Sequence, residues 1–153
     1  MKAIRIKKAI RVQAETTTVY AHLADITNHP GLQPLVVETQ ELGRSVDEAG
    51  HTVVHFFSIE QFRFLGFLPY RNKIRVKMVQ VPEENLIIHE VESFPNIRLI
   101  SQTRFEPKEG GGTAVSETLD IDTPNLLAGF VQKTADTAHE ALLQNLKARL
   151  EAV

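Results

Sequence analysis

The last part of the chain, TPNLLAGFVQKTADTAHEALLQNLKARL (Thr123–Leu150), decides the fold. Its apolar and small side chains recur every three or four residues, the spacing that places them on one side of an α-helix: Leu127, Phe130, Val131, Thr134, Ala138, Ala141, Leu142 and Asn145. The charged side chains fall opposite, at Lys133, Asp136, Glu140 and Lys147. This pattern predicts one long amphipathic helix over Pro124–Leu150, with Thr123 as N-cap and Pro124 in the first helical position.

Most of the chain before this helix has the alternating pattern of β-strands. The first segment places apolar Ile4, Ile6, Ile10 and Val12 on one face and charged Arg5, Lys7 and Arg11 on the other. A short helix over Thr16–Ile26 follows, breaks at residues 28–31, and leads into a second brief helical or turn piece that reaches Pro34. Six further strands are predicted at 35–43, 51–59, 70–81, 86–94, 97–106 and 113–122. Gly110-Gly111-Gly112 is typical of a hairpin turn.

The order of these elements indicates an α+β fold. The connections are short, and parallel strands would need longer crossovers, so the sheet is expected to be antiparallel. About seven strands that curve around one amphipathic helix would bury the apolar face of that helix. We therefore expect a single domain over residues 1–153: a curved antiparallel sheet, two short helices and a long C-terminal helix that together enclose a cavity.

Composition narrows the classes of function. The chain has 42% apolar and 24% charged residues and a formal net charge of -2, which is typical of a globular protein and argues against nucleic acid as a partner. The absence of cysteine excludes disulfides, thiolate metal ligands and cysteine nucleophiles, and favours a cytoplasmic location. No signal-like segment and no apolar run of membrane-spanning length is present, so no stable membrane insertion is expected.

Several local motifs, in their order and spacing, resemble the START-like (SRPBCC) superfamily. They are Val19-Tyr20-Ala21-His22-Leu23-Ala24-Asp25, residues 28–34, residues 64–70, and Thr103-Arg104-Phe105-Glu106-Pro107 with the following glycines. The resemblance covers nearly the whole chain and implies the helix-grip fold of polyketide cyclase/dehydrase-type and lipid-transfer proteins. Many relatives carry tryptophan near the position of Leu32, whereas this chain has none.

Two titratable residues are candidates for acid–base chemistry. If Glu90 and Glu92 pair with the basic face of the strand at 70–81, His89 points inward. It would then either contact a ligand or be a core histidine satisfied by a neighbouring hydroxyl. Glu117 follows the apolar face of its strand and is either a general base in a hydrated cavity, an exposed residue at the strand end, or the partner of a structural cation.

The remaining candidate residues would contact the ligand or pack in the core. Ser101 and Thr103 either orient a ligand or pack against their own backbone. His29 is expected to be a polar turn residue at the cavity mouth. The six histidines form no metal-binding spacing, so neither a metal site nor a cofactor is expected. Together with His89, Glu117, Ser101 and Thr103, the expected ligand-binding residues are Tyr70, Val91, Leu99, Leu119, Leu127, Phe130, Val131, Thr134 and Ala138.

Small residues on the inner face of the last helix, among them Ala135 and Ala138, would leave room for a guest molecule. The Phe-rich segment at 56–70 forms either a wall of the cavity or an exposed lip. These features favour binding or transport of a small hydrophobic ligand, such as a lipid or a polyketide-like or other aromatic compound. The alternatives are a cyclase, aromatase or dehydratase that uses His89 and Glu117, and a protein-interaction module of the same fold. A homodimer is left open beside a monomer.

Overall fold

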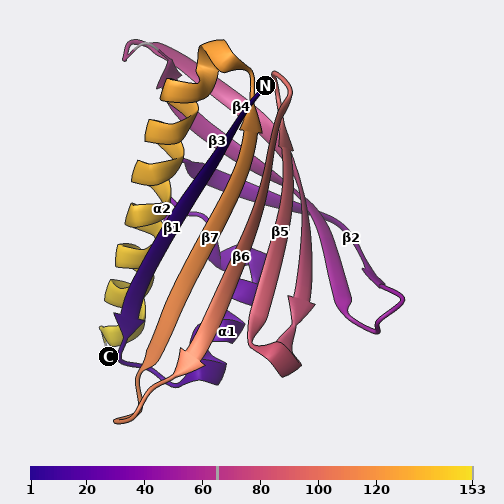
Figure 1. Ribbon diagram of the computed structural model, residues 1–153. Helices are drawn as coiled ribbons and strands as arrows, with labels where there is room; N and C mark the ends of the chain where they lie inside the picture. The colour runs from indigo at the N-terminus through magenta and orange to yellow at the C-terminus, as the bar shows by residue number, and fades with distance from the viewer. Residues whose placement is uncertain (65, 153) are drawn as a thin grey trace.

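The computed structural model describes residues 1–64 and 66–152, apart from the side chains of Phe62 and Phe64. Seven strands form one antiparallel sheet in the order β1-β7-β6-β5-β4-β3-β2 (Figure 1). The α+β helix-grip architecture is therefore confirmed. The strands are β1 (Lys2–Val12), β2 (Val36–Val46), β3 (Thr52–Phe64), β4 (Leu68–Val81), β5 (Leu86–Ser93), β6 (Ile97–Pro107) and β7 (Thr113–Thr123).

Charged pairs on the outer face agree with the expected alternation. Arg5 lies opposite Asp120 in the register of β1 and β7, and its guanidinium contacts that carboxylate at 2.7 Å. On the neighbouring pair, Lys77 lies opposite Glu90, with 3.3 Å between the charged atoms. Because the side-chain period of a strand is two, these outward pairs direct the residues beside them to the inner face.

The chain between Ile59 and Tyr70 differs from the prediction. The sequence pattern predicts a connection between two strands there, but β3 continues to Phe64 and β4 already begins at Leu68. The aromatic and branched side chains of this stretch suit a pleated strand surface, and Gly66, with φ of +81°, makes the turn between them. Of the Phe-rich segment, Leu65 and the side chains of Phe62 and Phe64 lie outside the described residues.

The first expected short helix is confirmed as α1 (Thr16–Ala24), followed at its end by a 3-10 turn, η1 (Ile26–Asn28). The second expected piece, after the break at 28–31, is a turn over residues 31–35 and not a helix. The long helix begins later than predicted. Pro124 has an extended ψ of 140°, a 3-10 turn, η3 (Asn125–Leu127), follows it, and α2 runs over Ala128–Glu151 without a side-chain cap. Thr123 ends β7 and its hydroxyl donates to the carbonyl of Pro124 at 3.4 Å, so it is not the N-cap. The chain must turn at the end of β7 before a helix can lie across the sheet.

The larger of the two clusters of packed side chains gathers at one end of the molecule. The C-terminal end of α2 lies beside α1 and the end of β1, whereas η3 and the start of α2 lie at the opposite end (Figure 1). Asn145 and Arg149 of α2 donate to the carbonyls of Leu32 and Asn28 at 2.9 and 2.8 Å. The main cluster of buried side chains includes Val19, Phe56 and Leu146. Among the described residues, no helix has the length and apolar character needed to cross a membrane.

Candidate functional site

Two adjacent pockets lie between the sheet and α2. The outer pocket has a volume of about 540 Å³ and the inner pocket about 140 Å³. Both are lined by Gln33, Glu60, Ile74, Val91, Leu99 and His139. Because they share these walls, one ligand can extend from the outer pocket into the inner one.

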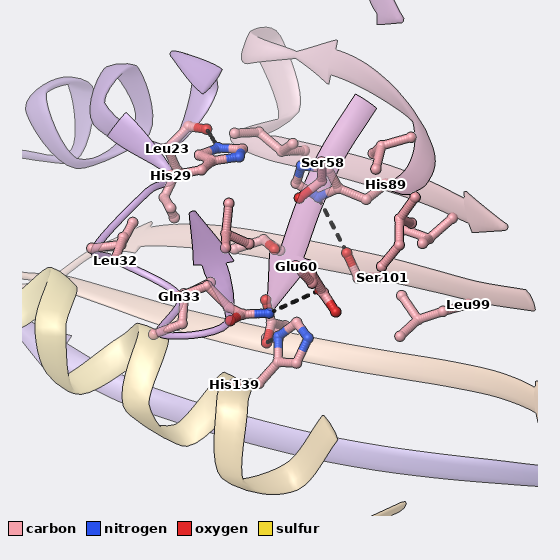
Figure 2. A pocket seen from close by; sticks show the side chains of 18 of the residues that line it. Leu23, His29, Leu32, Gln33, Ser58, Glu60, His89, Leu99, Ser101 and His139 are labelled. Carbon is pink, nitrogen blue, oxygen red and sulfur yellow. Dashed lines mark hydrogen bonds and ion pairs between the residues drawn. The ribbon is translucent and has the colours of Figure 1, made fainter. Parts of the chain in front are cut away.

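The two pockets differ in chemistry. The outer pocket has a mostly apolar wall formed by α2, the start of β4 and the turn after β5, with Leu127, Phe130, Ala135, Phe94 and Ile97 among its residues. The inner pocket holds the polar groups His29, Ser58, His89 and Ser101, which Figure 2 labels. Thr103 and Glu117 line it as well. These walls therefore fit a ligand with an apolar body and a polar end.

The expected ligand-binding residues are divided between the two pockets. His89, Ser101, Thr103 and Glu117 line the inner pocket, and Val91 and Leu99 line both. The outer pocket takes Tyr70, Leu127, Phe130, Val131, Thr134 and Ala138. Leu119 lines neither, because it is fully buried against Ile4, Ile6 and Ile121 in a second core cluster. Leu119 was expected to bind the ligand, but in the structure it packs in the core.

His89 lies in β5 and faces the inner pocket. Its Nδ1 lies 3.2 Å from the Ser101 hydroxyl on β6, in agreement with the pairing of the two residues in the sheet (Figure 2). Burial lowers the pKa of His89 to about 3, and the neighbouring His29 and His139 act in the same direction. The ring is therefore neutral at physiological pH, with a hydroxyl partner at one nitrogen and the pocket beside it.

Glu117 makes a short contact with His139 inside the inner pocket. This buried carboxylate lies 2.7 Å from Nδ1 of His139 on α2, so the sheet and the helix are joined within the site. Since a carboxylate only accepts hydrogen bonds, Nδ1 carries the proton and Nε2 is left for the pocket. Burial alone would lower the pKa of His139, but the charge and hydrogen bond of Glu117 and the charge of Glu60 outweigh it and raise that pKa.

Glu60 of β3 lies at the junction of the two pockets. The amide of Gln33 donates to its carboxylate at 3.3 Å and accepts from the backbone of Leu35 at 2.6 Å, so the amide is held in place from both sides. Burial raises the pKa of Glu60, and the charge of His139 opposes this shift. A half-buried carboxyl that lines the same pocket as a second one, Glu117, is a costly arrangement that a folding core does not require.

Sequence reasoning missed Glu60, Gln33 and His139. The predicted third strand ends at residue 59, one position before Glu60, although Phe56 and Ser58 share its face. His139 follows Ala138 and lies four residues after Ala135, so helical spacing alone could have placed it inward. Gln33 lies in an irregular turn and carries no comparable signal.

His29 lies deeper than expected. Its Nε2 donates to the carbonyl of Leu23 at 2.9 Å, and its ring centroid is 6.1 Å from that of His89. It is therefore a wall residue of the inner pocket instead of a residue at the mouth. At the outer end, Phe67 is 66% and Phe94 74% exposed, while Phe56 is buried. Within the described part of the Phe-rich segment, Phe56 and Ile59 are thus core residues, whereas Phe67 is exposed.

None of the described His, Asp and Glu side chains forms a cluster of three that could hold a metal ion. His139, Glu117, Glu60 and His89 can supply hydrogen bonding and proton transfer.

Comparisons with known proteins agree with this geometry. The model of the family described as polyketide cyclase / dehydrase and lipid transport matches residues 3–151. A START superfamily protein from Mycobacterium smegmatis is 17% identical, with a TM-score of 0.72 and 97% of each chain covered. An aromatase/cyclase from a Streptomyces species is 16% identical, with a TM-score of 0.71, covering 99% of this chain and 98% of that one. A protein from Thermus thermophilus is 20% identical, with a TM-score of 0.71, covering 97% of this chain and 98% of that one. A comparison with curated protein sequences gives no match.

Proposed function

The chain belongs to the polyketide cyclase / dehydrase and lipid transport family, and on that premise we propose that it binds one small hydrophobic ligand between α2 and the sheet. The observation that carries the proposal is the outer pocket of about 540 Å³ with its largely apolar wall. An engineered apolar cavity of about 150 Å³ already binds benzene. The outer pocket therefore has room for a ligand of several rings or a comparable acyl chain.

The inner pocket supports the choice of an amphipathic ligand over a plain hydrocarbon. Glu117 already pairs with Nδ1 of His139, but Nε2 of that ring has no partner within the described residues. A ligand oxygen can hydrogen-bond to Nε2, whereas an apolar group would cover it without replacing its contact with water. The proposed ligand places its apolar body in the outer pocket and an oxygen-bearing end against these residues.

Native mass spectrometry of protein purified from its own host tests this proposal. We expect a mass increment of a few hundred daltons at one ligand per chain, and saturable displacement of an apolar fluorescent probe by the extracted compound. Protein that carries no small molecule and binds no probe would overturn the proposal.

A second candidate function, proton transfer on the bound ligand, is favoured by the contact between Glu117 and His139. In the neutral ring Nδ1–H donates to Glu117 and Nε2 accepts, so His139 can take a proton from a carbon next to a ligand carbonyl and return it. Glu117 would fix the tautomer and stabilise the imidazolium that forms.

This candidate is tested by hydrogen–deuterium exchange at the α-carbon of a bound aromatic ketone, 2-tetralone, followed by NMR in D₂O. If the protein catalyses exchange, Glu117→Gln should slow it by about 100-fold while 2-tetralone still binds. Glu48→Gln, in the exposed turn between β2 and β3, is the matched control and should leave the rate unchanged. Exchange no faster than in buffer would restrict the protein to ligand binding.

A further inference from the structure

The charges around the inner pocket restrict the charge that a ligand can have there. This inference rests on the proposed binding function. The described walls of both pockets contain no lysine or arginine. Two carboxyl groups, Glu60 and Glu117, line the inner pocket, and the nearest cationic group, His139, is already paired with Glu117 at 2.7 Å. A negatively charged ligand group would therefore enter without a free counter-charge and beside Glu60.

Lys8 does not change this balance. Its side chain follows Ile6 and Ile10 on the inner face of β1 and lies opposite Glu117 in the sheet register. Its ammonium is nevertheless held by α2, at 2.8 Å from Asp136 and 3.1 Å from Glu140. Lys8 therefore joins the strand to the helix at the edge of the site, and it lines neither pocket.

The hydrogen-bonding groups that remain suit a neutral partner. Nε2 of His139 has no partner within the described residues; it accepts a hydrogen bond in the neutral ring and donates one in the protonated ring, and a hydroxyl group suits either state. Glu60 receives only the long 3.3 Å contact from Gln33, so one of its oxygens is left for the pocket. A hydroxyl group can donate to the first and share a proton with the second, and a carbonyl can accept from a protonated Glu60.

From these placements we propose that the inner pocket selects an uncharged hydroxyl or carbonyl end of the ligand and excludes a carboxylate. Burying a charge without a partner is far more costly than burying a hydrogen-bonded neutral group. Simple fatty acids are therefore poor ligands, whereas phenols, alcohols and ketones with an apolar body are good ones.

Three probes with one aromatic skeleton test this selectivity: 2-naphthol, 2-naphthoate and 2-(aminomethyl)naphthalene, measured by isothermal titration calorimetry at pH 7.5. We expect 2-naphthol to bind at least about tenfold more tightly than 2-naphthoate, since the carboxylate finds no cation. The ammonium should also bind more weakly than the phenol, because its desolvation is only partly compensated by Glu60.

Glu60→Gln should narrow the preference for 2-naphthol over 2-naphthoate severalfold, because it removes the unpaired carboxyl at the junction. Glu38→Gln, on the exposed part of β2, changes the net charge equally and should leave the preference as it is. Equal affinity for 2-naphthol and 2-naphthoate, or tightest binding of the ammonium, would overturn the selectivity while ligand binding stood. Binding of none of the probes would overturn both proposals.

Discussion

Substitution of Ala138 by phenylalanine tests whether the space beside α2 is a cavity or a packed core. Ala138 is 6% exposed, which alone would indicate a core position, but it lines the outer pocket of about 540 Å³. A cavity of about 150 Å³ holds a benzene ring, so the new ring fits and occupies roughly a quarter of that volume. We expect the free energy of unfolding to change by less than about 1 kcal/mol, whereas overpacking a filled core costs about 1–3 kcal/mol.

The same ring should displace part of the ligand. Burial of one aromatic group is worth about 1.5–3 kcal/mol, so probe affinity is expected to fall roughly 10- to 150-fold. Urea unfolding and fluorescence titration on the same samples measure both effects. Ala24→Phe is the control, because Ala24 packs against the main core cluster: it should lose stability and keep its affinity. Ala138→Phe with a loss of about 1–3 kcal/mol and unchanged probe binding would refute the reasoning.

Three other substitutions give independent tests. Leu119→Ala should lower the free energy of unfolding by about 2–5 kcal/mol and leave probe affinity unchanged; weaker binding at unchanged stability would return Leu119 to the site. The lowered pKa of His89 means that its unfolded form, but not its folded form, takes up a proton as pH falls below its ordinary value of 6.5. Between pH 7 and pH 5 the free energy of unfolding of the protein should therefore fall by about 2 kcal/mol more than that of His89→Gln. The same pH dependence of the two free energies, measured by urea unfolding, would contradict this. In Glu117→Gln the pKa of His139 should fall, because the charge that raises it is gone; an unchanged NMR titration midpoint of His139 would show that Glu117 is not its main partner.

The fold was readable from the sequence because it rests on repeated local patterns. Alternation places Arg75 and Lys77 opposite Glu92 and Glu90, and the same alternation turns His89 and Glu117 to the pocket side. The long helix followed from its apolar spacing. Its start did not, because a threonine and a proline at a strand end give the same local signal as a capped helix.

The site was only partly readable, since its key contacts join elements far apart in the chain. Glu117 lies in a strand and His139 in a helix. Gln33 lies in the turn before β2, whereas Glu60 lies in β3. Which candidate partner is within reach depends on how α2 lies across the curved sheet, and no local period encodes that. Leu119 has the same local pattern as a pocket residue but lies where the helix packs tightly.

The outer pocket and the main core cluster occupy different ends of the molecule, and of the buried residues described for that cluster only Ile74 also lines the pocket. The second core cluster does reach this end, because Val131 and Ala135 of α2 pack against it and also line the pocket. Pocket residues that belong to neither cluster, such as Leu68 and Thr134, can therefore change what is bound with little effect on whether the chain folds. Single substitutions at such positions can give the protein a new ligand without first needing a reserve of stability. The start of β4 is accordingly the first place to alter when the binding preference is to be redesigned.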